Sequence, residues 1–204
     1  MKFLIAENGG LDLAKETLLN GELVVVPTET VCGVAALATN ARAMEKLSTL
    51  KERPADQAFS LMVYDVEEAK KLWLPGPERD RALLLIAKFC PGPLTIVAPF
   101  NIASGLEPRL FPQGTVGIRI PRHAVLLQLL QAVRFPLAVP SANLRGAAPP
   151  TLIRDVCLPE VMVALDADCD QQGLPSTVAQ VFRQDLKVLR EGAISKEELL
   201  AAIS

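Results

Sequence analysis

The sequence is poor in aromatic residues and histidine, and its charges almost cancel. Only 4% of the 204 residues are aromatic, one is a histidine, and 21 basic residues face 23 acidic ones, for a net charge of −2. A sequence pI near 5.6 excludes the bulk positive charge of a protein that binds nucleic acids without specificity. A local basic cleft remains compatible with these sums, because a net charge does not describe how the charges are distributed.

The four cysteines are far apart in the sequence and form no C-x-x-C pair; they are Cys32, Cys90, Cys157 and Cys169. With a single histidine, this spacing argues against a structural zinc site and against a disulfide framework, and we expect no metal held by the protein. Residues 1–10 become polar too soon for a signal peptide, and no apolar run approaches the roughly 20 residues that cross a bilayer. We therefore expect a cytoplasmic protein with reduced thiols and no contact with a membrane.

Two common nucleotide-binding motifs are also missing. The chain has no G-x-x-x-x-G-K-[ST] loop, and no G-x-G-x-x-G follows its first predicted strand. The single histidine, His123, is expected to be a solvated residue at a helix start. Cys32 is interpreted as a small packing residue, because no histidine base is near it in the sequence. Glu29 could be a general base or a structural carboxylate, and the sequence leaves both roles open.

Helices and strands alternate along the whole chain without a change of composition that would mark a linker. Apolar periodicity and capping residues predict helices over 11–19, 40–50, 66–72, 79–89, 123–133 and from 196 to the end. Short apolar runs predict strands over 23–26, 61–63, 94–98, 116–120, 137–139, 161–165, 178–182 and 187–189. Two late strands in succession favour a sheet of mixed direction over a doubly wound one, in one α/β domain of residues 1–204.

Six short polar segments follow the apolar strands and helices. They are Thr28-Glu29-Thr30, Lys51-Glu52-Arg53-Pro54, Arg119, Ser141-Ala142-Asn143, Ser176-Thr177 and Arg190. Ligands of open α/β sheets usually bind at strand ends. Guanidinium and ammonium groups that converge on one cleft suit a polyphosphate, while hydroxyl and amide groups orient a small polar substrate.

Each segment also has an ordinary structural interpretation. Lys51 and Arg53 could compensate the dipole of the helix that precedes them, and Ser141 could form a turn. Arg119 could be a charge on an edge strand, but its apolar neighbours in VGIRIP indicate burial, and a buried arginine requires a bound anion or a carboxylate. Such an interpretation is sufficient for any one segment, whereas six segments together favour a binding site.

The ordered motifs PTETVCG, LKERPAD, PGPLT, VGIRIP, PSANLRG, PSTV and VLREGAIS resemble the YrdC/TsaC family of threonylcarbamoyl-AMP synthases, in its single-domain form. The resemblance runs from about Gly21 to Ser195, and the combination of PTET, K-x-R-P and SAN in this order is specific. It implies a twisted, open, mixed α/β sheet with flanking helices and a concave basic cavity. It also implies an ATP-dependent nucleotidyltransferase that condenses L-threonine, bicarbonate or CO2, and ATP into threonylcarbamoyl-adenylate and pyrophosphate. A separate threonylcarbamoyl transferase complex then modifies tRNA with the product.

The resemblance also assigns binding roles to eight side chains and a supporting role to a ninth. Those expected to contact L-threonine are Thr30, Arg119 and Ser176. Those expected to bind the nucleotide and its phosphates are Lys51, Arg53, Ser141, Asn143 and Arg190. Lys51 and Arg53 would be the catalytic residues, and Arg119 would pair with the threonine carboxylate. Thr28 would support the loop, and Mg²⁺ would accompany ATP, held largely by triphosphate oxygens and water.

The residues around the motifs depart from the usual family pattern. Cys32 stands where family members usually have an aromatic residue, and Gln57-Ala58-Phe59 replaces a histidine or lysine followed by Pro-Leu or Gly-Leu. Two alternatives to the synthase therefore stay open. One is a divergent paralogue that acts on another amine, and the other is a module that mainly binds RNA.

Overall fold

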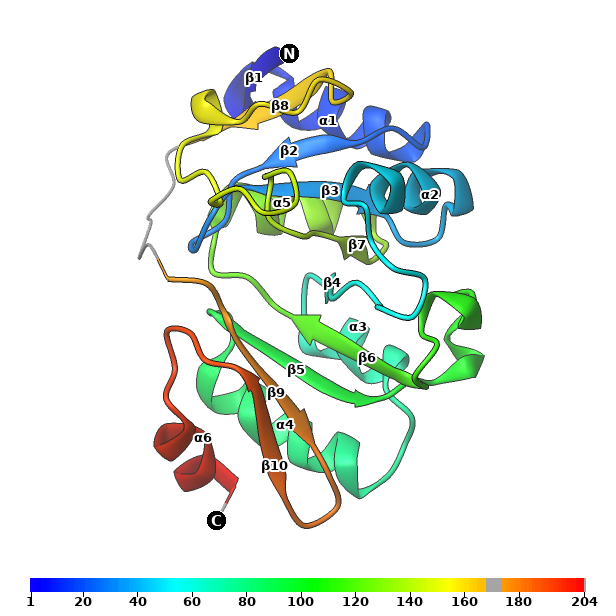
Figure 1. The fold of residues 1–204 in the computed structure, drawn as a ribbon, viewed down its shortest axis with the longest axis vertical. Coiled ribbons are helices and arrows are strands. Elements are labelled where there is room, and N and C mark those ends of the chain that lie inside the picture. The colour runs from blue at the N-terminus through cyan, green and yellow to red at the C-terminus, as the bar shows by residue number, and fades with distance from the viewer. Residues whose placement is uncertain (168–173, 204) are drawn as a thin grey trace.

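Ten strands form one open sheet in the computed structural model, which describes residues 1–167 and 174–203 (Figure 1). Their spatial order is β1-β8-β2-β3-β7-β4-β6-β5-β9-β10. The strands are β1 (Lys2–Ile5), β2 (Val24–Val26), β3 (Gly33–Leu37), β4 (Leu61–Met62), β5 (Leu94–Pro99), β6 (Thr115–Arg119), β7 (Leu137–Ala138), β8 (Val163–Asp166), β9 (Thr177–Val181) and β10 (Leu186–Arg190). The pairs β1–β8, β2–β8, β4–β6 and β5–β9 are parallel, and the other neighbours are antiparallel. The predicted mixed, open sheet is confirmed.

Six α-helices and four short 3-10 turns connect and cover the strands. They are α1 (Gly10–Leu19), α2 (Ala41–Leu50), α3 (Val66–Leu72), α4 (Pro77–Phe89), α5 (Ala124–Val133), α6 (Lys196–Ile203), η1 (Ala6–Asn8), η2 (Ile102–Ser104), η3 (Pro108–Leu110) and η4 (Ile153–Asp155). Helix α1 packs on β1, β8 and α5, whereas α4 packs on β5, β9 and α6. Figure 1 shows the first group in the upper half of the molecule and the second in the lower half, with the two termini at opposite ends.

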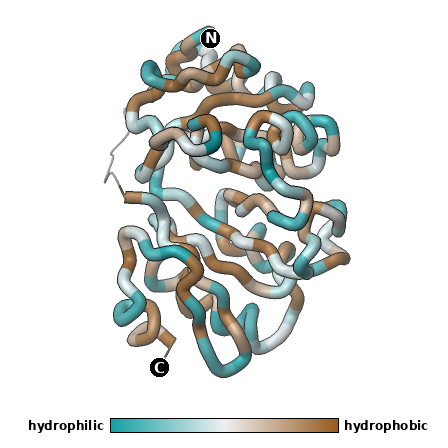
Figure 2. Tube along the Cα trace, in the orientation of Figure 1, coloured by the Kyte–Doolittle hydropathy of each residue, from teal (hydrophilic) through white to brown (hydrophobic). Residues whose placement is uncertain are grey.

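Hydrophobic residues follow the strands, and hydrophilic ones gather on the peripheral turns (Figure 2). All three residues of β2 and all five of β3 are buried, as are the helix faces that touch the sheet. Within the described part of the chain, no helix is long and apolar enough to cross a membrane. The predicted helices match the observed ones to within two residues at their starts, because local caps define them. Asn40 Oδ1 accepts from Ala43 N at 3.0 Å, and Ser195 and Glu198 exchange the two bonds of a capping box at 2.9 and 3.2 Å.

Two strands, β1 and β3, were not predicted. Strand β3 begins with glycine and two of its other residues are alanine, which are poor strand formers by propensity. The glycine is required by close packing, because a Cβ on Gly33 would lie 2.5 Å from Val139 Cγ1. Strand β1 is a short sequence with a lysine. It pairs with β8, about 160 positions away in the sequence, and a local sequence pattern cannot predict such a pairing.

The prediction for His123 was half wrong. The residue does start helix α5, but it is only 7% exposed rather than solvated, and its Nδ1 accepts the Leu126 N–H at 3.4 Å. The imidazole therefore serves as the N-cap, a role for which serine, threonine and aspartate are the usual signals. Cys32 is fully buried, as expected of a packing residue, and Cys169 lies outside the described residues.

We expect Gly33→Ala to reduce the free energy of unfolding by about 1–3 kcal/mol, because its Cβ would overlap Val139 in a packed interior. Chemical denaturation of the variant and of the wild type measures the difference. Val139→Ala opens space at the same point, so the double variant should lose less stability than the sum of the two single variants. Strict additivity would contradict this contact.

Candidate active site

The loop between β2 and β3 carries the Thr28-Glu29-Thr30 segment and is organised by one hydroxyl group. Thr28 Oγ1 accepts from the N–H groups of Thr30 and Val31 at 3.0 and 3.2 Å, and donates to Val31 O at 2.7 Å. Because its one hydrogen is used in this way, the 2.9 Å contact between the two threonine hydroxyls has Thr30 as the donor. Thr28 therefore fixes the loop and the direction of the Thr30 hydroxyl.

Arg119, at the end of β6, is buried against this loop. Its Nη2 lies 2.8 Å from Glu29 Oε1 and donates to Thr30 Oγ1 at 3.1 Å, while Nε donates to Gly92 O at 3.3 Å. The side chains of Arg119 and Glu29 are 6% and 5% exposed. The expectation that a buried Arg119 needs a charged partner is confirmed, and the partner within the chain is Glu29. Of the roles left open for Glu29, this geometry favours the structural carboxylate, bound to a guanidinium instead of to backbone N–H groups.

Lys51 ties the end of α2 to the Ser141-Ala142-Asn143 segment. Its Nζ donates to Ser141 O at 2.9 Å and to Asn143 O, and lies 3.4 Å from Asn143 Oδ1. The Asn143 amide donates in turn to Ala147 O at 2.7 Å, which closes the turn after β7. A lysine and a loop some 90 residues apart are thereby held together.

Arg53 is placed by the way α2 ends. Glu52 adopts a left-handed conformation with φ 44°, and the Arg53 N–H bonds to Ser48 O at 3.0 Å, the arrangement of a helix C-terminal Schellman motif. The guanidinium donates to Gln57 O at 3.0 Å and to Ala58 O, and stacks 4.3 Å from the ring centroid of Phe59. The segment Gln57-Ala58-Phe59, where the sequence departs from the usual family pattern, thus packs directly on Arg53, which is predicted to bind phosphate.

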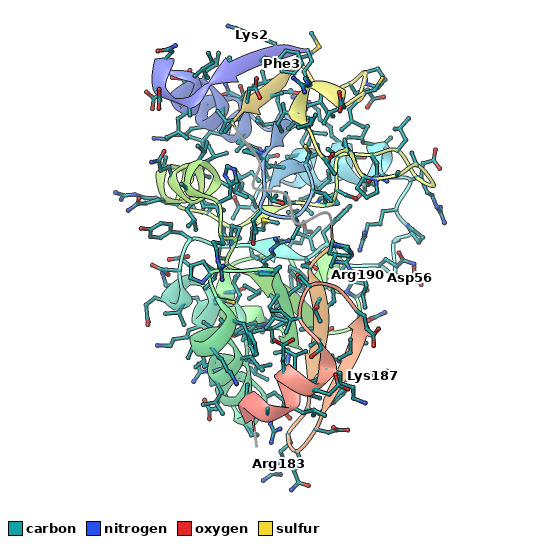
Figure 3. All side chains as sticks on the ribbon, turned by 90° about the vertical axis from the view of Figure 1, so that its left-hand side faces the viewer. Lys2, Phe3, Asp56, Arg183, Lys187 and Arg190 are labelled. Carbon is teal, nitrogen blue, oxygen red and sulfur yellow. The ribbon has the colours of Figure 1, made fainter. Side chains whose placement is uncertain are left out.

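Arg190 and Ser176 form a third group at the start of β9 and the end of β10. The guanidinium donates to Ser176 O from Nε at 3.1 Å and from Nη2 at 2.8 Å, and to Ser176 Oγ at 2.9 Å. Ser176 Oγ also lies 3.2 Å from Thr95 Oγ1 of β5. Figure 3 shows Arg190 near the middle of the molecule, whereas Lys187 and Arg183 of the same hairpin lie farther toward its end.

These groups surround one cavity of about 270 Å³. Its walls include every predicted site residue except Asn143, which lies behind Lys51 and contacts it. Ser60, Met62 and Thr95 also line the cavity and were not predicted as site residues, and Phe59, which lines it too, was noted only as part of a departure from the family pattern. A polar residue at a strand start, such as Ser60 or Thr95, is the one local signal that could have identified part of this set.

Four cations, Lys51, Arg53, Arg119 and Arg190, line the cavity, and no carboxylate of the described residues does. The predicted basic cavity is therefore confirmed in a chain whose net charge is −2. Burial lowers the pKa of Lys51, and the charge of Arg53 lowers it further. Burial also lowers the pKa of Arg53 and, together with the charge of Arg119, that of Arg190. An anion that entered the cavity would relieve this repulsion.

A metal site of the chain's own is not found within residues 1–167 and 174–203. No three His, Cys, Asp or Glu side chains of this part come together in a group that could hold a metal ion. The polar groups that line the cavity are hydroxyl, guanidinium and ammonium groups, which suit an anion better than a cation.

The fold and the site define an open-sheet α/β protein with a cavity built for a polar anionic ligand. A model of the Sua5, YciO and YrdC family, described as "Telomere recombination", matches residues 16–192. The chain belongs to the Sua5/YciO/YrdC family.

Relatives in this family carry similar names. A threonylcarbamoyl-AMP synthase of Bacillus subtilis is 34% identical over 194 residues, which are 93% of this chain and 55% of the relative. One of Pyrococcus abyssi is 32% identical over 95% of this chain and 57% of the relative. A putative threonylcarbamoyl-AMP synthase of Methanocaldococcus jannaschii is 31% identical over 93% and 88%. The chain thus spans little more than half the length of the first two relatives.

Solved structures agree on the fold. The crystal structure of P. abyssi Sua5 complexed with L-threonine superposes with a TM-score of 0.90 at 28% identity, over 100% of this chain and 61% of that one. E. coli YciO superposes with a TM-score of 0.82 at 21% identity, over 97% and 98% of the two chains, and at this identity supports the fold alone.

We expect the affinity of the cavity for inorganic triphosphate to fall as the pH rises from 7 toward 10. The pKa of Lys51 is lowered, so the free protein loses this charge below the ordinary titration range of lysine, and binding then has to take up a proton. Titration calorimetry in buffers of different ionisation enthalpy measures both the affinity and the proton uptake. Lys51→Arg, which stays protonated, is the matched control and should lose most of the pH dependence. An unchanged pH profile in this variant would assign the titration to another group.

Proposed function

We propose that this protein is an L-threonylcarbamoyladenylate synthase, an ATP-dependent nucleotidyltransferase. It would form threonylcarbamoyl-AMP and pyrophosphate from L-threonine, bicarbonate or CO2, and ATP. The observation that carries the proposal is one cavity in which a buried arginine, Arg119, and a separate pair of cations, Lys51 and Arg53, lie among hydroxyl groups. The names of the relatives and the L-threonine complex of P. abyssi Sua5 support it.

Arg119 suits a carboxylate better than a phosphate chain, because it is deeply buried and already fixed on two sides. Its named contacts use Nε and Nη2, so Nη1 is left for the carboxylate of an amino acid. Thr30 and Ser176 add hydroxyl groups that would orient the remainder of L-threonine. Thr30 is directed by Thr28, and Ser176 by Arg190, so both hydroxyls are held in place before the substrate enters.

The phosphate groups would bind at Lys51 and Arg53, which are half buried and, among the described residues, are bonded to neutral oxygens. Ser141 lies beside Lys51 and would contact the nucleotide, as would Arg190 from the other side. Asn143 would act by holding the loop around Lys51. Mg²⁺ would enter as part of the nucleotide substrate, bound by triphosphate oxygens and water, because the described cavity residues offer no carboxylate.

The reaction requires that the substrates are positioned and that the charge which develops on the leaving group is stabilised. It requires no covalent intermediate with the protein. The threonine amine, once deprotonated, adds to CO2: its lone pair forms a C–N bond, one C=O π bond of CO2 breaks to give the second carboxylate oxygen, and a proton of the nitrogen passes to water, which leaves a carbamate. A carbamate oxygen then attacks the α-phosphorus of ATP, and the bond to pyrophosphate breaks. Lys51 and Arg53 would stabilise the charge that develops on the leaving pyrophosphate, a kind of stabilisation that is often worth about 10²–10³ in rate.

The product is a mixed anhydride and has to be consumed by a second protein. We propose that a threonylcarbamoyl transferase complex passes the group to tRNA, and that both proteins work in the cytoplasm. Direct binding of RNA to this chain, and use of another amine, remain the two alternatives that the experiment below separates.

The test is release of pyrophosphate from ATP and bicarbonate, scanned over the twenty amino acids. We expect a signal specific for L-threonine, and a loss of at least about 100-fold in kcat/KM for Lys51→Met, because a charge at the leaving group is removed. The matched control is Lys70→Met, an exposed lysine on α3 away from the cavity, which should leave the rate unchanged.

Two other results would support the alternatives to the synthase. A signal with a different amine would identify a paralogue with another substrate. Silence with every amino acid, together with tRNA binding that weakens steeply with salt, would contradict the synthase and support the RNA-binding alternative.

A further inference from the structure

The four cations of the cavity are not equivalent. Lys51, Arg53 and Arg190 donate to carbonyl and hydroxyl oxygens, which are neutral, and make no ion pair with a described carboxylate. Arg119 alone of the four has a carboxylate partner in this part of the chain, Glu29 Oε1 at 2.8 Å. Glu29 therefore neutralises the positive charge of Arg119, whereas no described carboxylate neutralises the charges of the other three cations.

Glu29 is placed so that it reaches a ligand in the cavity through Arg119 rather than by direct contact. It is 4% exposed and is not among the residues that line the cavity, although its loop neighbours Thr28 and Thr30 are. Neither of its carboxylate oxygens has a hydrogen-bond partner among the described residues beyond the ion pair with Arg119. A carboxylate that is buried in this way behind a guanidinium cannot touch a ligand in the cavity, but its charge reaches through a low-dielectric interior.

Without Glu29, this part of the cavity would attract small anions of any kind. Arg119 and Arg190 line the same cavity, where Arg119 donates to Thr30 Oγ1 and Arg190 to Ser176 Oγ, and the charge of the first lowers the pKa of the second. Two guanidinium groups in one cavity, with no carboxylate beside them, are a usual composition of a site for sulfate or phosphate. The nucleotide brings several such groups, so its phosphate chain would compete with any smaller ligand for Arg119.

We propose that Glu29 is a positioning residue that also sets the anion specificity of Arg119. It orients the guanidinium together with Thr30 and Gly92, and it cancels enough charge for Arg119 to accept the single carboxylate of a zwitterionic amino acid but to reject a phosphate group. Lys51 and Arg53, which have no such partner among the described residues, then keep the polyphosphate. The identity of the amino acid as L-threonine rests on the proposed function, whereas the rejection of divalent anions does not.

The first experiment compares the wild type with Glu29→Gln, which keeps the shape of the side chain and removes its charge, and with Glu29→Asp, which keeps the charge. The KM for L-threonine is measured against sulfate at constant ionic strength. We expect little change in the wild type and in Glu29→Asp, and competitive inhibition by sulfate in Glu29→Gln that raises the KM about tenfold. The KM for ATP should change less than that for L-threonine. Equal sulfate sensitivity in the wild type and Glu29→Gln would overturn the proposal, since a merely structural role of Glu29 gives no anion-dependent effect.

The second experiment needs no catalysis. Sulfate binding is measured by calorimetry and by the melting temperature for the wild type, Glu29→Gln and the double variant Glu29→Gln/Arg119→Met. We expect Glu29→Gln to gain a sulfate site that the double variant lacks. Where Glu29→Gln unfolds in chloride buffer, recovery of the folded protein by sulfate that exceeds the recovery of the double variant supports the proposal, because sulfate also stabilises folded proteins without a specific site, and an equal recovery overturns it.

The two experiments together separate this inference from the proposed function. A new sulfate site that depends on Arg119, in a protein inactive with L-threonine, would sustain the role of Glu29 and reject the synthase. Full activity with L-threonine and no new sulfate site in Glu29→Gln would support the synthase and reject the proposed role of Glu29.

Discussion

The buried ion pair between Glu29 and Arg119 is the interaction on which the rest of the site depends. Glu29 belongs to the loop between β2 and β3 in the upper half of the molecule, and Arg119 ends β6 in the lower half (Figure 1). Their contact therefore joins the two halves beside the cavity, whose wall includes Arg119 but not Glu29. Because removing one member of a buried pair leaves an uncompensated charge, such pairs tolerate change poorly even where they add little net stability.

The other three cations are held by hydrogen bonds to neutral oxygen atoms rather than by a carboxylate. Lys51 donates to a backbone carbonyl oxygen 90 residues away, Arg190 to one 14 residues away, and Arg53 to one within its own turn. Carbonyl oxygens fix the direction of a cation but leave its formal charge in place. Partial burial lowers the pKa of each of these groups, and a neighbouring cation lowers those of Lys51 and Arg190 further. An anion in the cavity would offset both effects. The cavity thus contains two kinds of cation. Three of them are bound to neutral acceptors and keep their full charge, and the fourth, Arg119, has a carboxylate beside it.

Much of this could be predicted from the sequence, and for identifiable reasons. Helices α2 and α6 were predicted because their caps, Asn40 and the Ser195–Glu198 box, are local signals. Thr30, Arg119 and Ser176 could be selected because polar residues beside buried strands are uncommon without a partner. The burial of His123 could not be predicted, because imidazole is an unusual helix cap and its environment is made by distant residues. Strand β3 was missed because glycine and alanine have low strand propensity, and Gly33 is required there by its close packing against Val139, a residue distant in sequence.

The sequence by itself determined the residue types of the site and the family to which the ordered motifs point, since these depend on side-chain chemistry and on order along the chain. It also determined that Arg119 needs an opposite charge, because a buried guanidinium cannot remain unpaired. Only the tertiary structure decided that this charge is Glu29, that Asn143 stands behind Lys51, and that one cation of four is neutralised within the described chain. Such pairings join residues some 90 positions apart, and their geometry is set by the packing of the whole sheet rather than by any local pattern.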